Sequence, residues 1–396
     1  MKYAIYGISC CGKDTLINNL LDSNNFLGYT HPEGSKSLNN ISLKIYGRLF
    51  KEISSRSQKD IRDKYAEILD KERNIFSDGH YCFPGKNHYD IVFTEKDAKC
   101  YDAFFYLKTN PEEIKKRISN SNKNQQYANL TISDLAIWQQ KEINDLQDIC
   151  FNINKDFIIF DNDFNNTLNF IDKYNKNYRI INSRQQAIRL ANKCKAISKE
   201  NKKIALFDCD RTIIAEDSGT IFFNANNASL NSVKEIFKDD CYTQYQFWKY
   251  HNLYKNFTEH PSIFQYSINP IIEESIKKLR KEQFFIIGIT SGIGEIWRQI
   301  NKRQKLVDLM ISSTPHLIIS NFTKGFLVKF LSKDCEVFAC GDSLADIYML
   351  ESANNGIIFA PGKLRPSIQE YLDSHPKTNI KQFKQNPNQY QNIEAI

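Results

Sequence analysis

The sequence predicts an α/β protein with two parallel-sheet domains, because short apolar runs alternate with helix-like segments in two separate series. In the first series, apolar runs at 2–6 (KYAIY), 103–107 and 157–160 are separated by helix-like stretches such as 111–119 and 132–149. A second series follows after a polar stretch rich in Asn and Lys. The 396 residues suffice for two domains of about 100–200 residues each.

We expect the first domain to cover residues 1–165 and the second to cover residues 203–396. Residues 166–202 between them are predicted to be a linker region with a helix at 183–198. The polar tail from about residue 374 is expected to be partly disordered.

The second series predicts several strands, and the long gap after the first of them predicts helices over residues 215–281. The expected strands are 203–207 (KIALF), 284–289 (FFIIGI), 317–320 (LIIS), 337–340 (VFAC) and 356–359 (GIIF).

The composition restricts the partners and the compartment. The chain has 53 Lys and Arg against 46 Asp and Glu, a net charge of +7, which favours anionic ligands. The basic residues are spread out, so nucleic acid is left open as a partner but is not favoured. The ten cysteines form no CxxC pair, as expected for reduced thiols in the cytoplasm, and no apolar run reaches the length of a membrane span. The oligomeric state is not predicted.

The first apolar run leads into GISCCGKDT, in which Gly7, Gly12 and Lys13 match the phosphate-binding pattern G-x-x-x-x-G-K. In such a loop, backbone N–H groups at the start of a helix surround phosphates, and the lysine reaches the terminal ones. Asp14 replaces the usual Ser or Thr that contacts Mg²⁺, and Thr15 follows it. The pattern predicts a nucleotide-binding P-loop that takes ATP.

Two further stretches support this interpretation. NIFSDGHYCF carries Asp78 at the end of an apolar run, and the segment PEEIKKRI carries Arg117. Together with the loop, they resemble nucleoside-monophosphate kinases over residues 1–165. The resemblance implies that Asp78 orients Mg²⁺ or the acceptor and that Arg117 faces the ATP phosphates. Glu33, Arg48, Arg56 and Arg62 are candidates for acceptor binding, whereas the expected lid offers only Lys123.

In the second half, LFDCDRTI ends an apolar strand in Asp208 and Asp210. Beyond a strand end the chain turns, so both carboxylates can converge on one point, where a cation such as Mg²⁺ would neutralise them. Three features follow in order. They are Thr290-Ser291 after a second strand, Lys324 ahead of an amphipathic helix, and Asp342 with Asp346 after a third strand.

This ordered set resembles the haloacid dehalogenase (HAD) phosphatase superfamily over residues 203–365. The resemblance implies that Asp208 is the nucleophile and Asp210 the general acid/base. Ser291 or Thr290 would hold the phosphoryl oxygens. Lys324, with Lys329 as the alternative, would neutralise charge.

Within the same resemblance, Asp208, Asp210 and Asp342 would bind Mg²⁺, and Asp346 would orient the site. The segment 215–281 would be a helical C1 cap, which usually implies a small substrate. Tyr242, Tyr245, Phe247 and Trp248 could line the enclosed site, although such aromatics more often form the core of a cap.

We therefore predict a Mg²⁺-dependent phosphohydrolase acting on a small phosphorylated metabolite or nucleotide, fused to an ATP-binding kinase-like domain. One alternative is a polynucleotide kinase–phosphatase for nucleic-acid end repair. The other is a phosphatase regulated by a nucleotide-sensing P-loop domain without catalytic activity.

Overall fold

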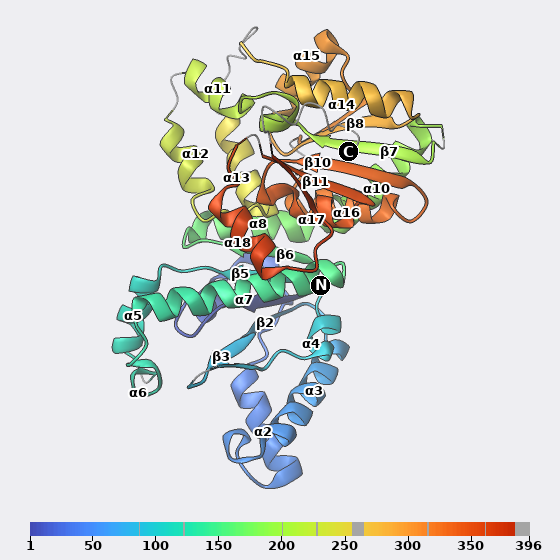
Figure 1. Cartoon of the computed structure of the whole chain (residues 1–396). Helices are drawn as coiled ribbons and strands as arrows, with labels where there is room; N and C mark the ends of the chain where they lie inside the picture. The colour runs from blue at the N-terminus through green and yellow to red at the C-terminus, as the bar shows by residue number, and fades with distance from the viewer. Residues whose placement is uncertain are drawn as a thin grey trace. The chain divides into compact units, whose positions relative to one another are not determined.

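The computed structural model describes residues 1–384 except 87, 122, 200, 227–228, 256–264, 315–316 and 361. The chain divides into two compact units, Met1–Asn177 (the N-terminal unit) and Tyr178–Ile396 (the C-terminal unit). Each unit is built on its own parallel sheet with helices around it (Figure 1). The prediction of an α/β fold with two parallel sheets is confirmed.

The N-terminal unit has a four-stranded parallel sheet in the order β2-β1-β5-β6. Its strands are β1 (Lys2–Tyr6), β2 (Ile75–Gly79), β5 (Ala103–Leu107) and β6 (Asp156–Phe160). All residues of β5 and β6 are buried, which explains why they appear in the sequence as continuous apolar runs. The helices are α1 (Lys13–Leu21), α2 (Gly34–Tyr46), α3 (Ser55–Lys71), α4 (Glu95–Cys100), α5 (Pro111–Ser119), α6 (Asn124–Tyr127), α7 (Ile132–Asn152) and α8 (Phe164–Lys176).

A small hairpin lies outside this sheet. β3 (Cys82–Pro84) and β4 (Tyr89–Ile91) pair antiparallel with each other. The hairpin follows β2 directly, and the long helix α7 fixes its start. Glu142 of α7 accepts hydrogen bonds from the backbone amides of Tyr81 and Cys82 at 3.0 and 3.1 Å.

The C-terminal unit has a six-stranded parallel sheet in the order β12-β11-β10-β7-β8-β9. Its strands are β7 (Lys203–Asp208), β8 (Phe285–Thr290), β9 (Leu309–Ser312), β10 (Glu336–Gly341), β11 (Asn355–Ala360) and β12 (Lys381–Lys384). The helices are α9 (Tyr178–Ile181), α10 (Ser183–Ile197), α11 (Ser218–Ala225), α12 (Leu230–Ile236), α13 (Gln244–Tyr254), α14 (Pro270–Lys281), α15 (Gly294–Gln304), α16 (Asn321–Leu331), α17 (Ile347–Ser352) and α18 (Pro366–Ser374).

This sheet lies between two helical layers (Figure 1). Phe207 and Phe338 point to one face, where they share a core with Ile272 and Ile276 of α14 and Trp297 of α15. α10 and α17 both pack against α16 on the other side. Covered on both faces, the central strands hold their carboxyl ends at one edge, where open α/β sheets bind ligands.

One sequence expectation in this unit is wrong. Residues 317–320 do not form a strand, because Leu317 pairs only with Thr314 in a turn and Ser320 caps α16 through the amide of Thr323. The strand that follows β8 is instead β9. Part of the polar tail is ordered, since β12 pairs with β11 at the sheet edge. Residues 385–396 lie outside the described residues.

The segment 215–281, predicted to be a helical cap, holds α11 to α14, and its residues 256–264 lie outside the described part. α14 belongs to the sheet core, whereas α11, α12 and α13 border the site described below and are called the cap helices here. The expected linker 166–202 contains α8, which belongs to the N-terminal unit, and α9 and α10, which belong to the C-terminal unit. Among the described residues, none of the helices combines the length and apolarity needed to cross a membrane.

Candidate functional site

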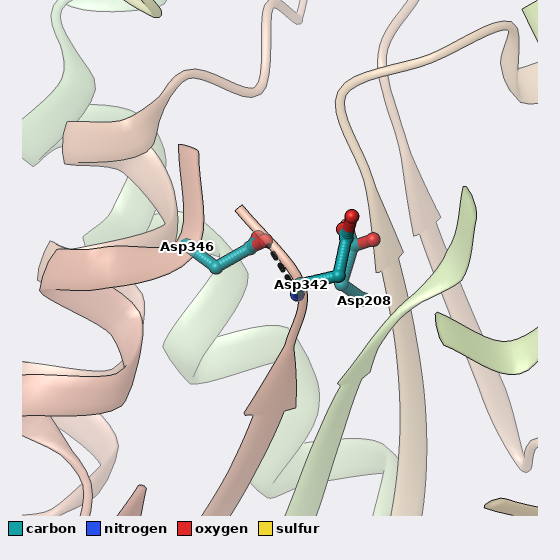
Figure 2. A group of neighbouring side chains, drawn as sticks. All are labelled: Asp208, Asp342 and Asp346. Atoms are coloured by element: carbon teal, nitrogen blue, oxygen red, sulfur yellow. Dashed lines mark hydrogen bonds between the residues drawn. The ribbon is translucent and has the colours of Figure 1, made fainter. Parts of the chain in front are cut away.

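Three carboxylates meet at the carboxyl end of the second sheet. Asp208 ends β7, and Asp342 and Asp346 follow β10. One oxygen from each lies within 4.8 Å of the others. Figure 2 shows the carboxylates of Asp208 and Asp342 side by side, with Asp346 turned toward the backbone of Asp342. Parallel strands that end at the same edge thus bring together residues more than 130 positions apart in the sequence.

A sharp turn after β7 gives Asp210 an environment different from that of Asp208. Arg211 adopts a left-handed conformation, with φ at 58°, within the turn Cys209–Ile213. Asp210 accepts hydrogen bonds from the Ser218 amide at 2.7 Å and from Trp297 Nε1 at 3.2 Å. Burial, and next the charge of Asp217, raise the pKa of Asp210 to about 6. A carboxyl group with that pKa can exchange a proton near neutral pH.

Lys324 of α16 is the central cation of this site. Its Nζ donates to Asp208 Oδ1 and to Asp346 Oδ1, both at 2.6 Å, and the residue is only 1% exposed. Burial opposes the charge of the lysine, but the two carboxylates outweigh it and raise its pKa, so it stays protonated. Burial raises the pKa of Asp208, and Asp346 adds to this effect while Lys324 opposes it. Lys329, the alternative in the sequence, is not among the residues that line the site.

The two hydroxyls at the end of β8, those of Thr290 and Ser291, differ in their contacts. Thr290 Oγ1 accepts from the Gly292 amide at 2.8 Å and donates to Asp210 Oδ2 at 3.3 Å. Ser291 also lines the cavity, and its buried Oγ has no hydrogen-bond partner among the described residues. A buried hydroxyl without a partner is costly unless a ligand satisfies it, so Ser291 is the hydroxyl available to a bound group.

Asp346 stabilises the loop that follows β10. Its Oδ2 accepts from Ser343 Oγ at 2.8 Å and from the amides of Ser343 and Asp342 at 3.1 and 3.2 Å. Asp342 forms an ion pair with Arg365. Burial, followed by the charge of Asp346, raises the pKa of Asp342 to about 7.

A hard cation fits the carboxylate cluster. Asp208 and Asp342 supply oxygen ligands at adjacent strand ends, which is the donor chemistry that Mg²⁺ prefers. Asp210 does not belong to the carboxylate group defined by the 4.8 Å distance. Its side chain is bonded to Ser218, Trp297 and Thr290 instead, so metal binding by Asp210 stays a prediction.

The site opens into a cavity of about 640 Å³. Its floor is made by the strand ends, and the cap helices border it. The residues that line it include Asp217, Leu230, Val233, Phe237, Phe247 and Tyr250.

Sequence reasoning missed three contacts of this site. Trp297 binds Asp210, Arg365 binds Asp342, and His251 Nε2 donates to the Ser291 carbonyl at 3.1 Å. None of these residues lies in a motif, and each reaches the site from a helix or a loop distant in sequence. No sequence signal singles them out.

In the N-terminal unit, the loop between β1 and α1 holds the residues predicted to bind phosphate. Gly7 and Gly12 have positive φ angles of 151° and 107°. The buried Lys13 donates through Nζ to the carbonyl oxygens of Gly7 at 2.6 Å and Ile8 at 3.3 Å. Asp14 and Thr15 are exposed in the first turn of α1.

Two other predicted residues lie near this loop. Arg117 Nη1 donates to the Cys11 carbonyl at 2.8 Å, and its guanidinium also pairs with Glu113. Asp78, on the adjacent strand β2, is hydrogen-bonded to His31 Nε2 at 3.0 Å. The hydrogen bond with Asp78 raises the pKa of His31. Sequence reasoning missed His31, although it lies in the segment HPEGS that contains Glu33.

Glu33 itself is exposed and precedes α2. Two of the candidate acceptor arginines, Arg48 and Arg56, are exposed. Arg62 is half-buried, and its guanidinium stacks on the Phe50 ring, 4.8 Å from the centroid.

Comparisons with known proteins give distant structural similarities. No protein-family model matches the chain, and no curated protein matches it. It is similar to a phosphoserine phosphatase solved as a phospho-aspartyl intermediate analogue, with 18% identity and a TM-score of 0.32 over 46% of this chain and 92% of that one. A predicted phosphatase from Clostridium acetobutylicum shares 16% identity, with a TM-score of 0.36 over 50% of this chain and 100% of that one. Shikimate kinase from Bacteroides thetaiotaomicron shares 9% identity, with a TM-score of 0.32 over 44% of this chain and 98% of that one.

Proposed function

We propose that the C-terminal unit is a Mg²⁺-dependent phosphomonoester hydrolase of the HAD type. The observation that carries the proposal is the position of Lys324, whose buried amine contacts both Asp208 and Asp346 at 2.6 Å beside an unpartnered Ser291 hydroxyl. This arrangement supplies a nucleophile, a fixed positive charge and a phosphate-binding hydroxyl at one point.

In the proposed reaction, Asp208 attacks the phosphorus atom, and the bond from phosphorus to the ester oxygen breaks. Asp210 donates its proton to the departing alcohol, for which a pKa of about 6 is suitable. Asp210 then takes a proton from the water that hydrolyses the aspartyl-phosphate, which restores both carboxylates. Lys324 and Ser291 hold the phosphoryl oxygens, while Thr290 positions Asp210.

Asp208 and Asp342 would hold Mg²⁺. A bound Mg²⁺ would offset the negative charge that the phosphate brings to this acidic site. The protein contributes the orientation of the ligands, because Asp346 fixes the loop that carries Asp342 through the amides of residues 342 and 343.

The proposal is tested by phosphate release from a panel of esters with Mg²⁺, including nucleotides, sugar phosphates and a 3′-phosphorylated oligonucleotide. We expect the wild type to release phosphate from a small ester and Asp208→Asn to lose at least about 10³-fold in kcat, because the nucleophile is gone. Asp373→Asn, which changes an exposed carboxylate on α18, is the matched control and should keep full activity.

Two other outcomes would change the assignment. Preference for the oligonucleotide would favour nucleic-acid end repair. Equal phosphate release by the wild type and Asp208→Asn on every ester would contradict the phosphatase proposal.

We propose as a second function that the N-terminal unit binds ATP through the loop of Gly7 to Lys13 and transfers a phosphoryl group to a small acceptor. The supporting observation is the left-handed backbone at Gly7 and Gly12, at the carboxyl end of β1 and the start of α1, with Lys13 bonded to the loop carbonyls. Asp78 on the adjacent strand would orient Mg²⁺ or the acceptor, and Arg117 would face the phosphates.

Binding of ATP and its turnover are measured separately for this unit. We expect ATP·Mg to bind to the wild type and to Lys59→Met, an exposed control on α3, but at least about tenfold more weakly to Lys13→Met. ATP binding that changes phosphatase activity, without transfer to any acceptor, would favour the nucleotide-sensing alternative. Absence of ATP binding to the wild type would contradict both the kinase proposal and the nucleotide-sensing alternative.

A further inference from the structure

The cavity next to the carboxylates is larger than a phosphate group requires. It measures about 640 Å³, whereas one water occupies about 30 Å³ in the liquid. A phosphate held by Lys324 and Ser291 would fill only the end of it. The remaining space is bordered by the cap helices, so their side chains would contact the rest of the substrate.

The cap side of the cavity carries an apolar surface, beside which Lys234 and Lys238 also line the cavity. Leu230 and Val233 of α12 contribute to this surface, together with Phe237, Phe247 and Tyr250. The Phe237 ring lies 5.2 Å from the Phe247 ring and 5.8 Å from the Tyr250 ring, centroid to centroid. Because these rings pack on one another, the surface is formed before a ligand arrives. We call these five residues the apolar wall.

Tyr250 adds one polar group to the apolar wall. The side chain lines the cavity, and its hydroxyl has no hydrogen-bond partner within the part of the chain that the structure describes. It lies against Gly219, one residue after the Ser218 amide that binds Asp210. Burial and the nearby charges of Asp217 and Asp210 raise its pKa, so the phenol stays protonated and can donate a hydrogen bond.

We propose that the leaving group of the substrate is an alcohol with a ring-sized apolar body that packs on the apolar wall. Tyr250 then donates a hydrogen bond to an acceptor atom of that leaving group. The inference rests on the proposed phosphatase function, since the phosphate must lie at Asp208 for the leaving group to reach the wall. It assigns a specificity role to the cap helices and disfavours small polar alcohols as leaving groups.

The first test compares benzyl phosphate with ethyl phosphate and glycerol 3-phosphate. All three leaving groups carry the ester oxygen on a saturated carbon, so a preference reports contact with the protein rather than the ease of bond breaking. We expect kcat/KM for benzyl phosphate to exceed that for ethyl phosphate by about 10- to 100-fold. A ratio near one, or preference for the smaller esters, would overturn the inference.

Matched variants test the wall itself. Val233→Asp places a charge in the apolar wall and should reduce the benzyl-to-ethyl ratio toward one. Ser232→Asp places the same charge on an exposed neighbour outside the cavity lining and should keep the ratio. If Val233→Asp unfolds, Val233→Thr should lower the ratio in the same direction. Equal ratios in the wild type and these wall variants would overturn the assignment.

Tyr250→Phe tests the hydrogen bond. This variant should lower kcat/KM for a nucleoside 5′-monophosphate, whose leaving group has acceptor atoms, by about five- to tenfold. Benzyl phosphate, whose leaving group has no acceptor besides the ester oxygen, should change less than twofold. An equal loss on both esters would contradict the role of the hydroxyl.

The failure of this inference is separable from that of the proposed function. If no ester gives phosphate release that depends on Asp208, the phosphatase proposal fails, and the leaving-group inference fails with it. If ethyl phosphate and glycerol 3-phosphate are hydrolysed in an Asp208-dependent manner as fast as benzyl phosphate, only the leaving-group inference fails.

Discussion

Among single residues, Gly219 of α11 lies directly against the Tyr250 side chain of α13. A Cβ atom at this position would overlap the Tyr250 hydroxyl oxygen, and it would lie 3.3 Å from Tyr250 Cζ. The glycine therefore sets how closely α13 approaches the first turn of α11. The contact matters for the site, because the adjacent Ser218 amide binds Asp210.

We predict that Gly219→Ala lowers the free energy of unfolding by about 1–3 kcal/mol, the usual cost of overpacking. The same substitution in a Tyr250→Phe background should cost less than half as much, since the overlapping oxygen is absent. Urea unfolding of the four proteins in a double-mutant cycle measures this coupling. Equal costs in both backgrounds would show that the hydroxyl does not limit the space at residue 219.

Lys324 is the residue with the largest expected effect on stability. Lys324→Met leaves Asp208 and Asp346 facing each other without a cation, which should cost about 3–5 kcal/mol at pH 7. Burial and the charge of Asp346 raise the pKa of Asp208 above its value in the unfolded chain, and the variant loses the lysine that opposes this shift. The folded form of the variant is then favoured at low pH and loses stability as pH rises through the folded pKa of Asp208.

Urea unfolding with EDTA at pH 5 and pH 7.5 tests this prediction. The difference between the wild type and Lys324→Met should be smaller at pH 5. Lys329→Met, on the same helix, is the control and should cost less than about 1 kcal/mol at both pH values. A pH-independent loss in Lys324→Met would mean that packing, rather than charge, explains its cost.

At the scale of elements, His251 links α13 to the end of β8. The Ser291 carbonyl can only accept, so Nε2 carries the proton in this contact. Burial lowers the pKa of His251 to about 4, whereas the unfolded side chain titrates near 6.5. Between these values the unfolded chain binds more protons than the folded one, so the contribution of His251 to stability falls as pH decreases from about 6.5 to 4.

We predict that His251→Gln, which keeps a donor but does not titrate, removes this pH dependence. Relative to the variant, the wild type should lose about 2 kcal/mol of unfolding free energy between pH 7 and pH 5. Comparing the two proteins cancels the carboxylates that titrate in the same range. Parallel stability curves for the wild type and His251→Gln would contradict a lowered histidine pKa.

The sequence predicted the elements that are determined by neighbouring residues in the chain. It missed those whose conformation depends on contacts with residues distant in sequence. Strand β7 and its two aspartates were predictable, because an apolar run followed by carboxylates is visible in eight residues. Residues 317–320 look like a strand, since three of them are apolar and three are buried, yet they lead into α16, whose first turn Ser320 caps. An apolar run in the sequence predicts that a segment is buried. Whether that segment becomes a strand depends on which backbone groups it hydrogen-bonds with.

The same distinction applies to the site. The residues with motif spacing were found in the sequence, including Asp208, Lys324 and Asp346. The choice between Thr290 and Ser291 required the structure, because which hydroxyl already has a partner depends on residues distant in sequence. Of the apolar wall only Phe247 was a candidate, since these side chains are typical of ordinary helix cores until a cavity is seen beside them.

At the scale of the whole molecule, the chain contains two compact units with separate sheets and separate candidate sites. If each unit unfolds by itself, a ligand specific to one site should stabilise only the unit that binds it. We therefore expect two thermal transitions by calorimetry, with a non-hydrolysable ATP analogue and Mg²⁺ raising one and orthovanadate with Mg²⁺ raising the other.

At a ligand concentration 100 times the Kd, the stabilisation is about 2.7 kcal/mol, which corresponds to about 5–10 °C for a unit of this size. Lys13→Met should abolish only the shift caused by the nucleotide, and Asp208→Asn only the shift caused by vanadate, because each removes a contact to one ligand. The exposed substitutions Lys59→Met and Asp373→Asn should keep both shifts. A single transition that both ligands raise together would mean that the two units unfold as one, and each ligand would then report on the whole chain.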